Sequence, residues 1–450
     1  MHSIQPILTH RRVWTLAGPI ILSNISVPLV GAVDTAVVGH LPEPDSIGAV
    51  AIGALIFTFL FWGFGFLRMG TTGFIARAYG ANDEQALSDT LLRVLLLAIS
   101  FGLVVIVFGY PLIHFALYLL DSSDNIESLA ASYATIRIWS APATLTMYAI
   151  TGVFIGLQNM RYVFVLQLVM NIVNVLLDLL FVLAFDMGVE GVALATLIAE
   201  YLAALLGFWL LRKHLAKAYR QLNWTRLLER NSILALMKAN VDIFIRTLCL
   251  VFSFGYFTAK SASMGEVVLA ANAILLHLQS ILAYALDGFA HAAEALSGNA
   301  YGAGKQKQFK RAVKLTTIWG LFCALAISLL YWFFGSFILQ LFTNIDAVLL
   351  TANNYLPWTI IAPLVSIWSF QLDGIFIGTG YTREMRNAMI VSMLIYLALL
   401  LVLVPALGNH GLFLSLTLFM VIRALTLGYY YPGIVKAMDH KSQIEAGSIS

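Results

Sequence analysis

Apolar stretches long enough to cross a lipid bilayer recur along the whole chain. Of its 450 residues, 60% are hydrophobic and only 11% are charged, whereas soluble domains carry about 25% charged residues. The apolar residues are gathered into blocks of about 20 residues, which is the length that a helix needs to span the hydrocarbon core. The sequence therefore predicts an all-α membrane protein with many transmembrane helices.

Twelve spans can be placed, and the charge of the connectors between them alternates. The spans are expected at residues 14–38, 48–69, 91–118, 129–153, 162–184, 191–211, 233–256, 268–292, 312–334, 350–376, 388–405 and 411–432. Acidic or neutral connectors alternate with connectors that hold most of the 26 lysines and arginines. Because positive residues stay on the cytoplasmic side, we expect both chain ends in the cytoplasm and the protein in the plasma (inner) membrane.

The two halves of the chain carry the same short sequences in the same order. The sequence AYGA at 78–81 recurs at 300–303, and G-x-F-I-G at 152–156 recurs at 374–378, both 222 positions later. Gly188 and Gly191 recur as Gly408 and Gly411, 220 positions later. Six spans in each half give both halves the same orientation, and such parallel repeats commonly rock about a central site. This pattern favours a transporter over a channel.

The repeat also predicts the domain boundaries. Residues 1–211 are expected to form an N-lobe with the first six spans, and residues 212–232 a basic cytoplasmic linker. Residues 233–450 are expected to form a C-lobe with the last six spans and a cytoplasmic tail.

The first span combines an ionisable residue with two prolines. A carboxylate such as Asp34 is costly in an apolar span and usually faces a cavity or a partner. Pro19 and Pro28 each remove a backbone donor and allow the helix to bend. Apolar surroundings favour the neutral carboxyl group. We therefore hypothesise that uptake of a proton or a sodium ion by Asp34 is expressed as bending at one of these prolines.

The fifth span places three polar residues on one side of an apolar helix. Asn171, Asn174 and Asp178 follow one another at intervals of three and four, which brings their side chains onto one face. One interpretation is a first-half cavity, including Asp34, that binds a cation or proton. The alternative is that the asparagines only hydrogen-bond neighbouring helices. The two carboxylates favour the cavity, because burying them is costlier than burying amides.

The second half does not repeat these carboxylates. The position matched to Asp34 is Tyr256, while Asp287 and Asp373 lie in other spans. These two carboxylates either attract a cationic substrate in a central cleft or pair with the arginines at positions 246 and 423. As intramembrane carboxylates they are candidates for function in either case.

Three other charged residues have simpler expectations. Asp242 and Arg246 are four residues apart, so we expect them to pair within one helix. Arg137, near one end of its span, is expected to reach the membrane interface. The sequence leaves the role of Glu200 open.

Motifs of other classes of protein are missing from the sequence. There is no Walker loop, HExxH or G-x-S-x-G motif, and no basic segment typical of nucleic-acid binding. Cys249 and Cys323 have no metal-site spacing. We therefore predict no enzymatic activity, no cofactor and no nucleic-acid partner. An integral-membrane enzyme would need a convergent set of catalytic residues, and His277 and His291 are too far apart in the sequence to suggest one.

Several short sequences occur in a characteristic order. The first span ends with Val33-Asp34-Thr35-Ala36, a Gly-x-Gln-Asn-x-Arg sequence occupies 156–161, and Asn174-x-x-x-Asp178 precedes a GVALAT sequence at 191–196. Together with twelve spans in two halves, this ordered set resembles the multidrug and toxic compound extrusion (MATE) family, and within it the DinF-like branch.

The resemblance implies a fold, a function and a set of site residues. It implies two pseudo-symmetric six-helix lobes and an antiporter that exports cationic amphipathic compounds in exchange for H⁺ or Na⁺ by alternating access. It implies bending of the first span at Pro19. It also implies a coupling cavity in the first half, formed by Asp34, Tyr133, Asn174, Asp178 and Thr196.

Two questions stay open at this point. Oxygen ligands suit either coupling ion; we favour H⁺, with Na⁺ at Asp34, Asp178 and Asn174 as the alternative. The alternative function is a lipid or lipid-linked sugar flippase, whose cleft should be rich in arginine to hold phosphate. We expect a monomer that is surrounded by membrane lipid and takes small organic cations as substrates.

Overall fold

The computed structural model describes residues 8–39, 45–120 and 123–447, and within these residues the chain is helical without any β-strand. The first half contains α1 (His10–Val38), α2 (Asp45–Gly63), α3 (Phe66–Gly80), α4 (Glu84–Leu120), α5 (Asp124–Arg137), the 3₁₀-helix η1 (Ile138–Ser140), α6 (Ala141–Gly156), α7 (Met160–Asp178), the π-helix η2 (Leu179–Ala184) and α8 (Gly188–Arg220). The short α9 (Trp224–Leu227) is followed by α10 (Arg230–Ala262), α11 (Glu266–Gly302), α12 (Gln306–Phe342), α13 (Asp346–Thr379), α14 (Thr382–Leu407) and α15 (Asn409–Gly447).

Twelve helical segments correspond to the twelve predicted spans. Three segments of the first half are composite, because α2 continues into α3 after a turn, η1 joins α5 to α6, and η2 extends α7. In the described part of the chain, 10 segments are long and apolar enough to cross a membrane. Helices α1 and α10, with 29 and 33 residues, also exceed the length of about 20 residues that a span needs.

Most helices extend beyond the predicted spans. Helix α4 begins at Glu84, seven residues before the expected start at 91. Its first turns are polar and are stabilised locally: Asp83 Oδ1 accepts a hydrogen bond from the Ala86 amide at 2.8 Å, and Gln85 Nε2 donates to Asp89 Oδ1 at 3.0 Å. Apolar content therefore marks the membrane-embedded part of each helix and misses the polar turns at its ends.

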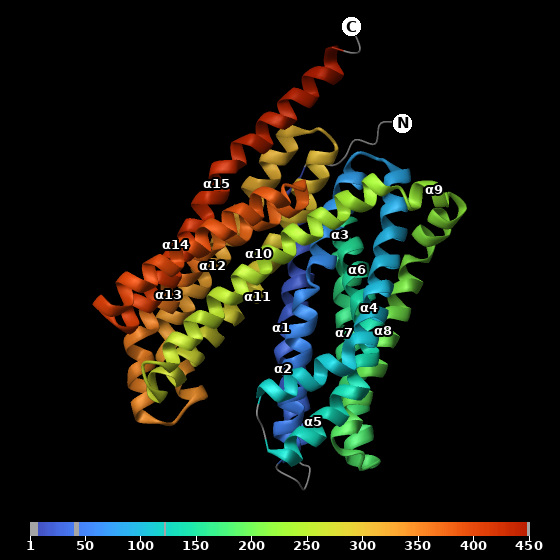
Figure 1. The fold of residues 1–450 in the computed structure, drawn as a ribbon. Helices are drawn as coiled ribbons and strands as arrows, with labels where there is room; N and C mark the ends of the chain where they lie inside the picture. The colour runs from blue at the N-terminus through green and yellow to red at the C-terminus, as the bar shows by residue number, and fades with distance from the viewer. Residues whose placement is uncertain (1–7, 40–44, 121–122, 448–450) are drawn as a thin grey trace. The chain divides into compact units, whose positions relative to one another are not determined.

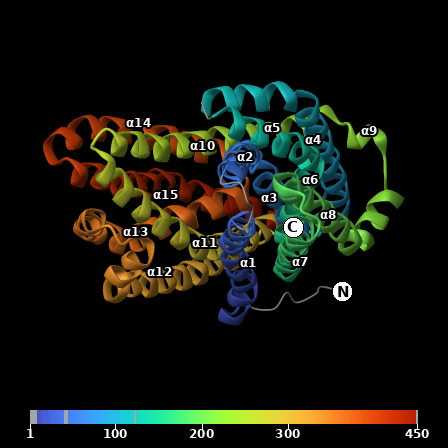
Figure 2. The same ribbon diagram turned by 90° about the horizontal axis from the view of Figure 1, so that it is seen from below.

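The chain divides into two compact units. The C-terminal unit contains Met1–Ile21, Ala76–Asn82 and Lys238–Ser450, and the N-terminal unit contains Leu22–Ile75 and Asp83–Met237. In the C-terminal unit, α10 to α15 run along one another, from yellow-green to red in Figures 1 and 2. Helix α1 contributes its first residues to one unit and the rest to the other. The lobe boundaries expected near residues 211 and 233 stay a prediction.

The sequence repeat is also a repeat of helix packing. In the N-terminal unit, a Cβ atom at Gly152 would lie 2.5 Å from the backbone oxygen of Arg68. In the C-terminal unit, a Cβ atom at Gly374 would lie 2.3 Å from the backbone oxygen of Ala290. Gly374 follows Gly152 by 222 positions, and Ala290 follows Arg68 by the same number. The same close crossing is therefore built twice, by α3 with α6 and by α11 with α13.

A second pair of glycines joins the end of α3 to the end of α11 within the C-terminal unit. A Cβ atom at Gly80 would lie 2.0 Å from the backbone oxygen of Asn299, and one at Gly302 would lie 2.1 Å from that of Arg77. Positions 77 and 80 recur as 299 and 302. The contact of Gly80 with residue 299 is therefore the repeat of the contact of Gly302 with residue 77. We call Arg77, Gly80, Asn299 and Gly302 the glycine junction. Arg77 Nη1 also donates a hydrogen bond to the Thr379 carbonyl at 2.9 Å.

Turns with positive φ recur at matching places in both halves. The pairs are Asn82 with Gly304, Gln158 with Gly380, and Gly188 with Gly408, with φ between 55° and 83°. The first two pairs are 222 positions apart and the third is 220 positions apart. These turns end or begin equivalent helices, so the repeat fixes the connections as well as the spans.

Replacement of Gly302 by alanine should destabilise the protein, because the added methyl group would collide with backbone rather than with a movable side chain. Overpacking of this kind costs about 1–3 kcal/mol. We expect a lower midpoint of thermal unfolding for the purified protein in detergent. Gly255→Ala in α10 is the matched control, because a Cβ atom there meets no atom within 4 Å. Equal midpoints for the two variants would show that the junction has room to adjust.

Candidate functional site

The predicted polar face of α7 is buried in the N-terminal unit. Asn171 is 7% exposed, Asn174 4% and Asp178 0%. Helix α8 runs beside α7 (Figure 1), and it supplies the partner of one asparagine: Asn174 Nδ2 donates to Thr196 Oγ1 at 3.2 Å. The Thr196 hydroxyl in turn donates to the Val192 carbonyl at 3.0 Å. The structure thus brings together Asn174 and Thr196, two of the residues proposed for one cavity, and Asp178 follows Asn174 by one turn of the same helix.

A residue that the sequence did not single out connects α1 to this face. Asn171 Nδ2 donates to Ser26 Oγ at 2.8 Å and its Oδ1 accepts from Gln167 Nε2 at 2.9 Å. Ser26 precedes Asp34 by eight residues, and residues spaced i, i+4 and i+8 lie along one side of a helix. This spacing was the signal in the sequence that could have added Ser26 to the site.

Asp178 lies where the geometry of the helix changes. The regular α-helix ends at Asp178, and the next six residues form the π-helix η2. A π-helical turn inside a helix is rare and is found frequently at functional sites. The fully buried carboxylate of Asp178 therefore lies next to a stretch of helix with non-standard hydrogen bonding.

Tyr133 of α5 is also buried, with 5% of its surface exposed. It lies against α2 at Gly53, where a Cβ atom would come within 2.3 Å of the tyrosine ring. The absence of a side chain at Gly53 therefore makes room for the ring. Tyr133 is therefore buried where α5 packs against α2.

The remaining two first-half predictions concern α1. Asp34 lies in α1, and its side chain is outside the described residues. Pro19 is half-buried, and α1 continues through it from His10 to Val38. Pro19 lies two residues before Ile21, where the contribution of α1 to the C-terminal unit ends.

A buried ion pair between α5 and α8 replaces the interfacial arginine expected from the sequence. Arg137 Nη2 binds Glu200 Oε1 at 2.9 Å, with side-chain exposures of 10% and 9%. Glu200 also accepts a hydrogen bond from the Thr144 hydroxyl. The Arg137 guanidinium lies 5.4 Å from the ring centroid of Phe57. The expectation that Arg137 reaches the interface was therefore wrong, because Glu200 on a neighbouring helix offers it a partner inside the protein.

In the C-terminal unit, one carboxylate is shared by two arginines. Asp373 Oδ2 on α13 binds Arg423 Nη2 of α15 at 2.7 Å and also binds Arg246 Nη2 of α10. All three residues are less than 9% exposed. Of the two roles that the sequence left open for Asp373, the structure shows the pairing with these arginines. We call the three residues the buried ion cluster.

The predicted pairing of Asp242 with Arg246 within α10 was wrong. Asp242 instead binds Arg386 Nη1 of α14 at 2.6 Å and accepts a hydrogen bond from the Thr382 hydroxyl at 3.1 Å. Arg246 has Asp373 as its partner. Asp242 and Arg246 pair with residues of other helices because these contacts fix both side chains in position. An i, i+4 pair within α10 would gain only about 0.2–0.5 kcal/mol.

Two carboxylates of α11 differ in burial. Asp287, the other second-half candidate, is half-buried. Glu294 is 1% exposed and lies 3.3 Å from His291 Nδ1. Glu294 was missed because the predicted span ended at 292, whereas α11 continues to Gly302.

No group of three or more His, Cys, Asp or Glu side chains able to hold a metal ion occurs among the residues that the structure describes. The polar face of α7 combines one carboxylate with amide and hydroxyl oxygens. A carboxylate is a group that takes up a proton, and carboxylate, amide and hydroxyl oxygens are ligands that suit a hard cation.

Comparison with known proteins decides the family. The sequence profile of the MatE family matches residues 19–180 and 243–402, with one stretch in each half. The chain belongs to the MATE family. It is 41% identical to the DNA damage-inducible protein F of Escherichia coli over 93% of this chain and 91% of that protein. The predicted resemblance to the DinF-like branch is thereby confirmed.

More distant relatives support the family of this MATE protein, and solved structures support its fold. Human multidrug and toxin extrusion protein 1 is 26% identical over 97% of this chain and 77% of its own length. A MOP superfamily transporter from Pyrococcus furiosus has a TM-score of 0.85 at 18% identity, covering 96% of both chains. A MATE structure in the bent conformation has a TM-score of 0.86 at 17% identity, covering 96% of this chain and 97% of that one. MATE proteins are multi-pass membrane transporters without a cofactor, and they are not enzymes.

Breaking the Arg137–Glu200 pair should destabilise this MATE protein. Glu200→Gln leaves a buried guanidinium without its counter-charge, which costs about 3–5 kcal/mol. The double variant Glu200→Gln with Arg137→Met should lose less stability than the sum of the single variants. Chemical unfolding of the three variants in detergent measures this coupling. Glu84→Gln, which breaks an exposed pair with Lys217, is the control and should change stability by less than about 1 kcal/mol. Additive losses would contradict a coupled pair.

Proposed function

We propose that this MATE protein exports cationic amphipathic compounds in exchange for H⁺ by alternating access. The observation that carries the proposal is the buried polar face of α7, with Asp178 fully enclosed beside Asn174 and Thr196. A buried carboxylate in a membrane-spanning helix is costly and marks an ion pathway or a proton relay. Relatives named for multidrug and toxin extrusion support the choice of exported compounds.

The coupling site in this proposal consists of Asp34, Tyr133, Asn174, Asp178 and Thr196. A proton taken up by one carboxylate removes a charge from the apolar interior, so α1 packs more tightly against α7. Loss of the proton reverses this and reopens the unit. The hydrogen bond between Ser26 and Asn171 supports the proposal, because it links α1 directly to the helix that carries Asp178.

Bending of α1 at Pro19 is the proposed mechanical step. Proline removes a backbone hydrogen bond and permits a kink. The contribution of α1 to the C-terminal unit ends only two residues after Pro19, so a bend there moves the part of α1 that carries Asp34 and leaves the first turns in place. Solved MATE structures are described in a bent and in a straight conformation, which is consistent with such a step.

The charges of the second half support coupling through the first half. Asp373 is occupied by two arginines, and Asp242 by Arg386. A positive substrate would have to compete with guanidinium groups for Asp373, and the half-buried Asp287 on α11 is the second candidate for a substrate contact. A flippase needs arginines that are available to bind phosphate. The intramembrane arginines at 137, 246 and 423 each bind a carboxylate instead.

The function is tested with purified protein in liposomes, a fluorescent organic cation and one gradient at a time. We expect transport driven by a pH gradient and none by a sodium gradient at equal pH. The reverse result would assign Na⁺ as the coupling ion, with ligands at Asp34, Asp178 and Asn174. No transport of any organic cation under either gradient would contradict the proposal.

In the same assay, Asp34→Asn and Asp178→Asn should each lose gradient-driven transport. Their thermal unfolding midpoints should stay equal or rise, because a neutral amide is cheaper to bury than a carboxylate. Asp83→Asn is the control, since this exposed residue caps α4 and asparagine caps as well as aspartate does. Full transport by Asp34→Asn would remove this carboxylate from the coupling site.

Pro19→Ala should slow transport without weakening the binding of the organic cation. Alanine restores the missing backbone donor and stiffens α1, so the turnover rate should fall more than the affinity for the organic cation. Pro28→Ala is the control in the same helix and should have the smaller effect. If Pro19→Ala transports at the unmodified rate, bending at this residue is not part of the cycle.

A further inference from the structure

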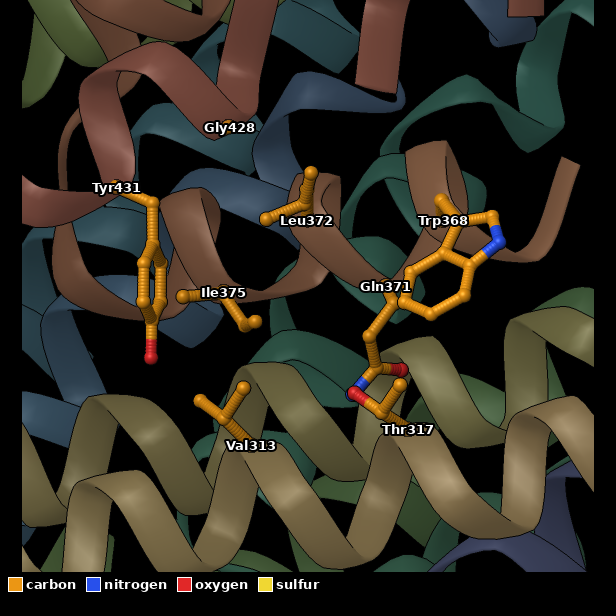
Figure 3. A pocket seen from close by; sticks show the side chains of 8 residues that line it. All are labelled: Val313, Thr317, Trp368, Gln371, Leu372, Ile375, Gly428 and Tyr431. Atoms are coloured by element: carbon orange, nitrogen blue, oxygen red, sulfur yellow. The ribbon is translucent and has the colours of Figure 1, made fainter. Parts of the chain in front are cut away.

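A groove lies at the surface of the C-terminal unit between α12, α13 and α15, as shown in Figure 3. Its cavity has a volume of about 220 Å³. Trp368 of α13 and Tyr431 of α15 stand at its two ends, and Val313 and Thr317 of α12 form its floor. None of the residues that line it is charged. The groove therefore offers flat aromatic and aliphatic surfaces on helices that are long enough to cross the membrane.

One polar side chain borders the groove and has an unused hydrogen-bond acceptor. Gln371 is 2% exposed, and its Nε2 donates to Thr316 Oγ1. The Thr316 hydroxyl already donates to the Ala312 carbonyl at 2.8 Å, so Thr316 can only accept from the amide. This fixes the orientation of the amide and leaves Gln371 Oε1 without a hydrogen-bond partner. A buried acceptor without a partner is unfavourable by about 1–3 kcal/mol, so this oxygen favours a ligand with a donor.

The groove exists because α15 has no side chain at position 428. A Cβ atom at Gly428 would meet no atom within 4 Å, and its φ is not in the left-handed region that requires glycine. A larger residue would therefore fill the groove without disturbing the backbone. The Tyr431 ring at one end of the groove is held in place by stacking on Phe309, with ring centroids 6.1 Å apart.

The groove is separate from the buried ion cluster. Gln371 and Asp373 are two residues apart on α13, which places them about 200° apart around a helix. Asp373 faces the two arginines, whereas Gln371 borders the groove at the surface. Trp368, with 46% of its surface exposed, continues the groove outward.

The local charges decide which form of a ligand the groove accepts. No carboxylate lines it, and Lys310 and Lys314 are exposed on α12 within four residues of Val313. These lysines repel a cation, and no carboxylate in the lining of the groove balances its charge. An uncharged amine keeps an N–H donor for Gln371 Oε1 and partitions into lipid.

We propose that this groove binds the neutral form of amphipathic aromatic amines directly from the lipid. The ring system lies between Trp368 and Tyr431, and the amine N–H donates to Gln371 Oε1. The proposal rests on the proposed function, because these are the conjugate bases of the compounds exported as cations. Proton uptake by the amine comes later, elsewhere in the transport path.

Photolabelling tests the proposal independently of transport. The probe is an aromatic secondary amine that carries a diazirine, added to the full-length protein in liposomes, with labelled peptides mapped by mass spectrometry. Labelling of α12, α13 and α15 around the groove is divided by labelling of the exposed face of α4. This ratio corrects for the amount of probe in the lipid. We expect the ratio to rise with pH as the neutral fraction of the amine grows.

Gly428→Leu should reduce the ratio to the background level by filling the groove. Gly433→Leu is the matched control, since Gly433 lies on the same helix with no atom within 4 Å of a Cβ atom and does not line the groove. Gln371→Leu should weaken competition by the unlabelled amine about tenfold. The N-methylated quaternary amine, which has neither an N–H group nor a neutral form, should not compete.

Equal labelling of the Gly428→Leu and Gly433→Leu variants would overturn the proposal, as would effective competition by the quaternary amine. Labelling at the groove in a protein that transports no organic cation would refute the proposed function and leave the binding site. Transport of the cation without labelling at the groove would refute the binding site and leave the proposed function. Elution from a size-exclusion column and the thermal unfolding midpoint show that each variant is folded.

Discussion

Direct contact between helix backbones at glycine is the interaction on which the rest of this structure depends. Lipid removes most of the hydrophobic driving force between helices, so close packing at small residues has to hold them together. Gly152 and Gly374 bring a helix against a neighbouring backbone in each unit, and Gly80 and Gly302 do so at the glycine junction. Each contact has a copy at the repeat distance. The crossings therefore fix the positions of α3, α6, α11 and α13, and α13 carries both Asp373 of the buried ion cluster and one side of the groove.

The second constraint is that a charge inside a membrane-spanning helix needs a partner. The second half satisfies it with direct ion pairs: Asp373 has two arginines and Asp242 has Arg386. Among the residues described in the first half, Arg137 pairs with Glu200, and amides and hydroxyls form the polar face that carries Asp178. A carboxylate held by an arginine keeps its charge through a transport cycle. A carboxylate surrounded by amides and hydroxyls can exchange its charge for a proton, which is why the proposed coupling site lies in the first half.

Periodicity and repetition predicted most of the fold, because both are properties of the sequence itself. The twelve spans, the offset of the repeat and the shared face of Asn171, Asn174 and Asp178 could be found this way. Partners across helices could not, because they depend on crossing angles that no local pattern contains. Asp242 and Arg246 had suitable spacing for a pair and found better partners on α14 and α13. Glu294 was overlooked because hydropathy ended its span too early. The hypothesis for Asp34 follows from the cost of a charge in an apolar span, whereas the choice of Pro19 over Pro28 as the bending point rests on the resemblance to the family.

The π-helix after Asp178 records where the two halves of the chain diverged. Gln158 and Gly188 are 30 positions apart, whereas their counterparts Gly380 and Gly408 are only 28 apart. Helix α14 of the second half is regular, while the first half places η2 and a short connector in the same interval. Hydrogen bonds of the i→i+5 kind absorb extra residues without ending a helix. An ancestral duplication followed by a two-residue insertion, or by a deletion in the other half, would leave this mark. The internal symmetry is thus broken beside the buried carboxylate, and the position that follows Asp178 by 222 residues is Leu400.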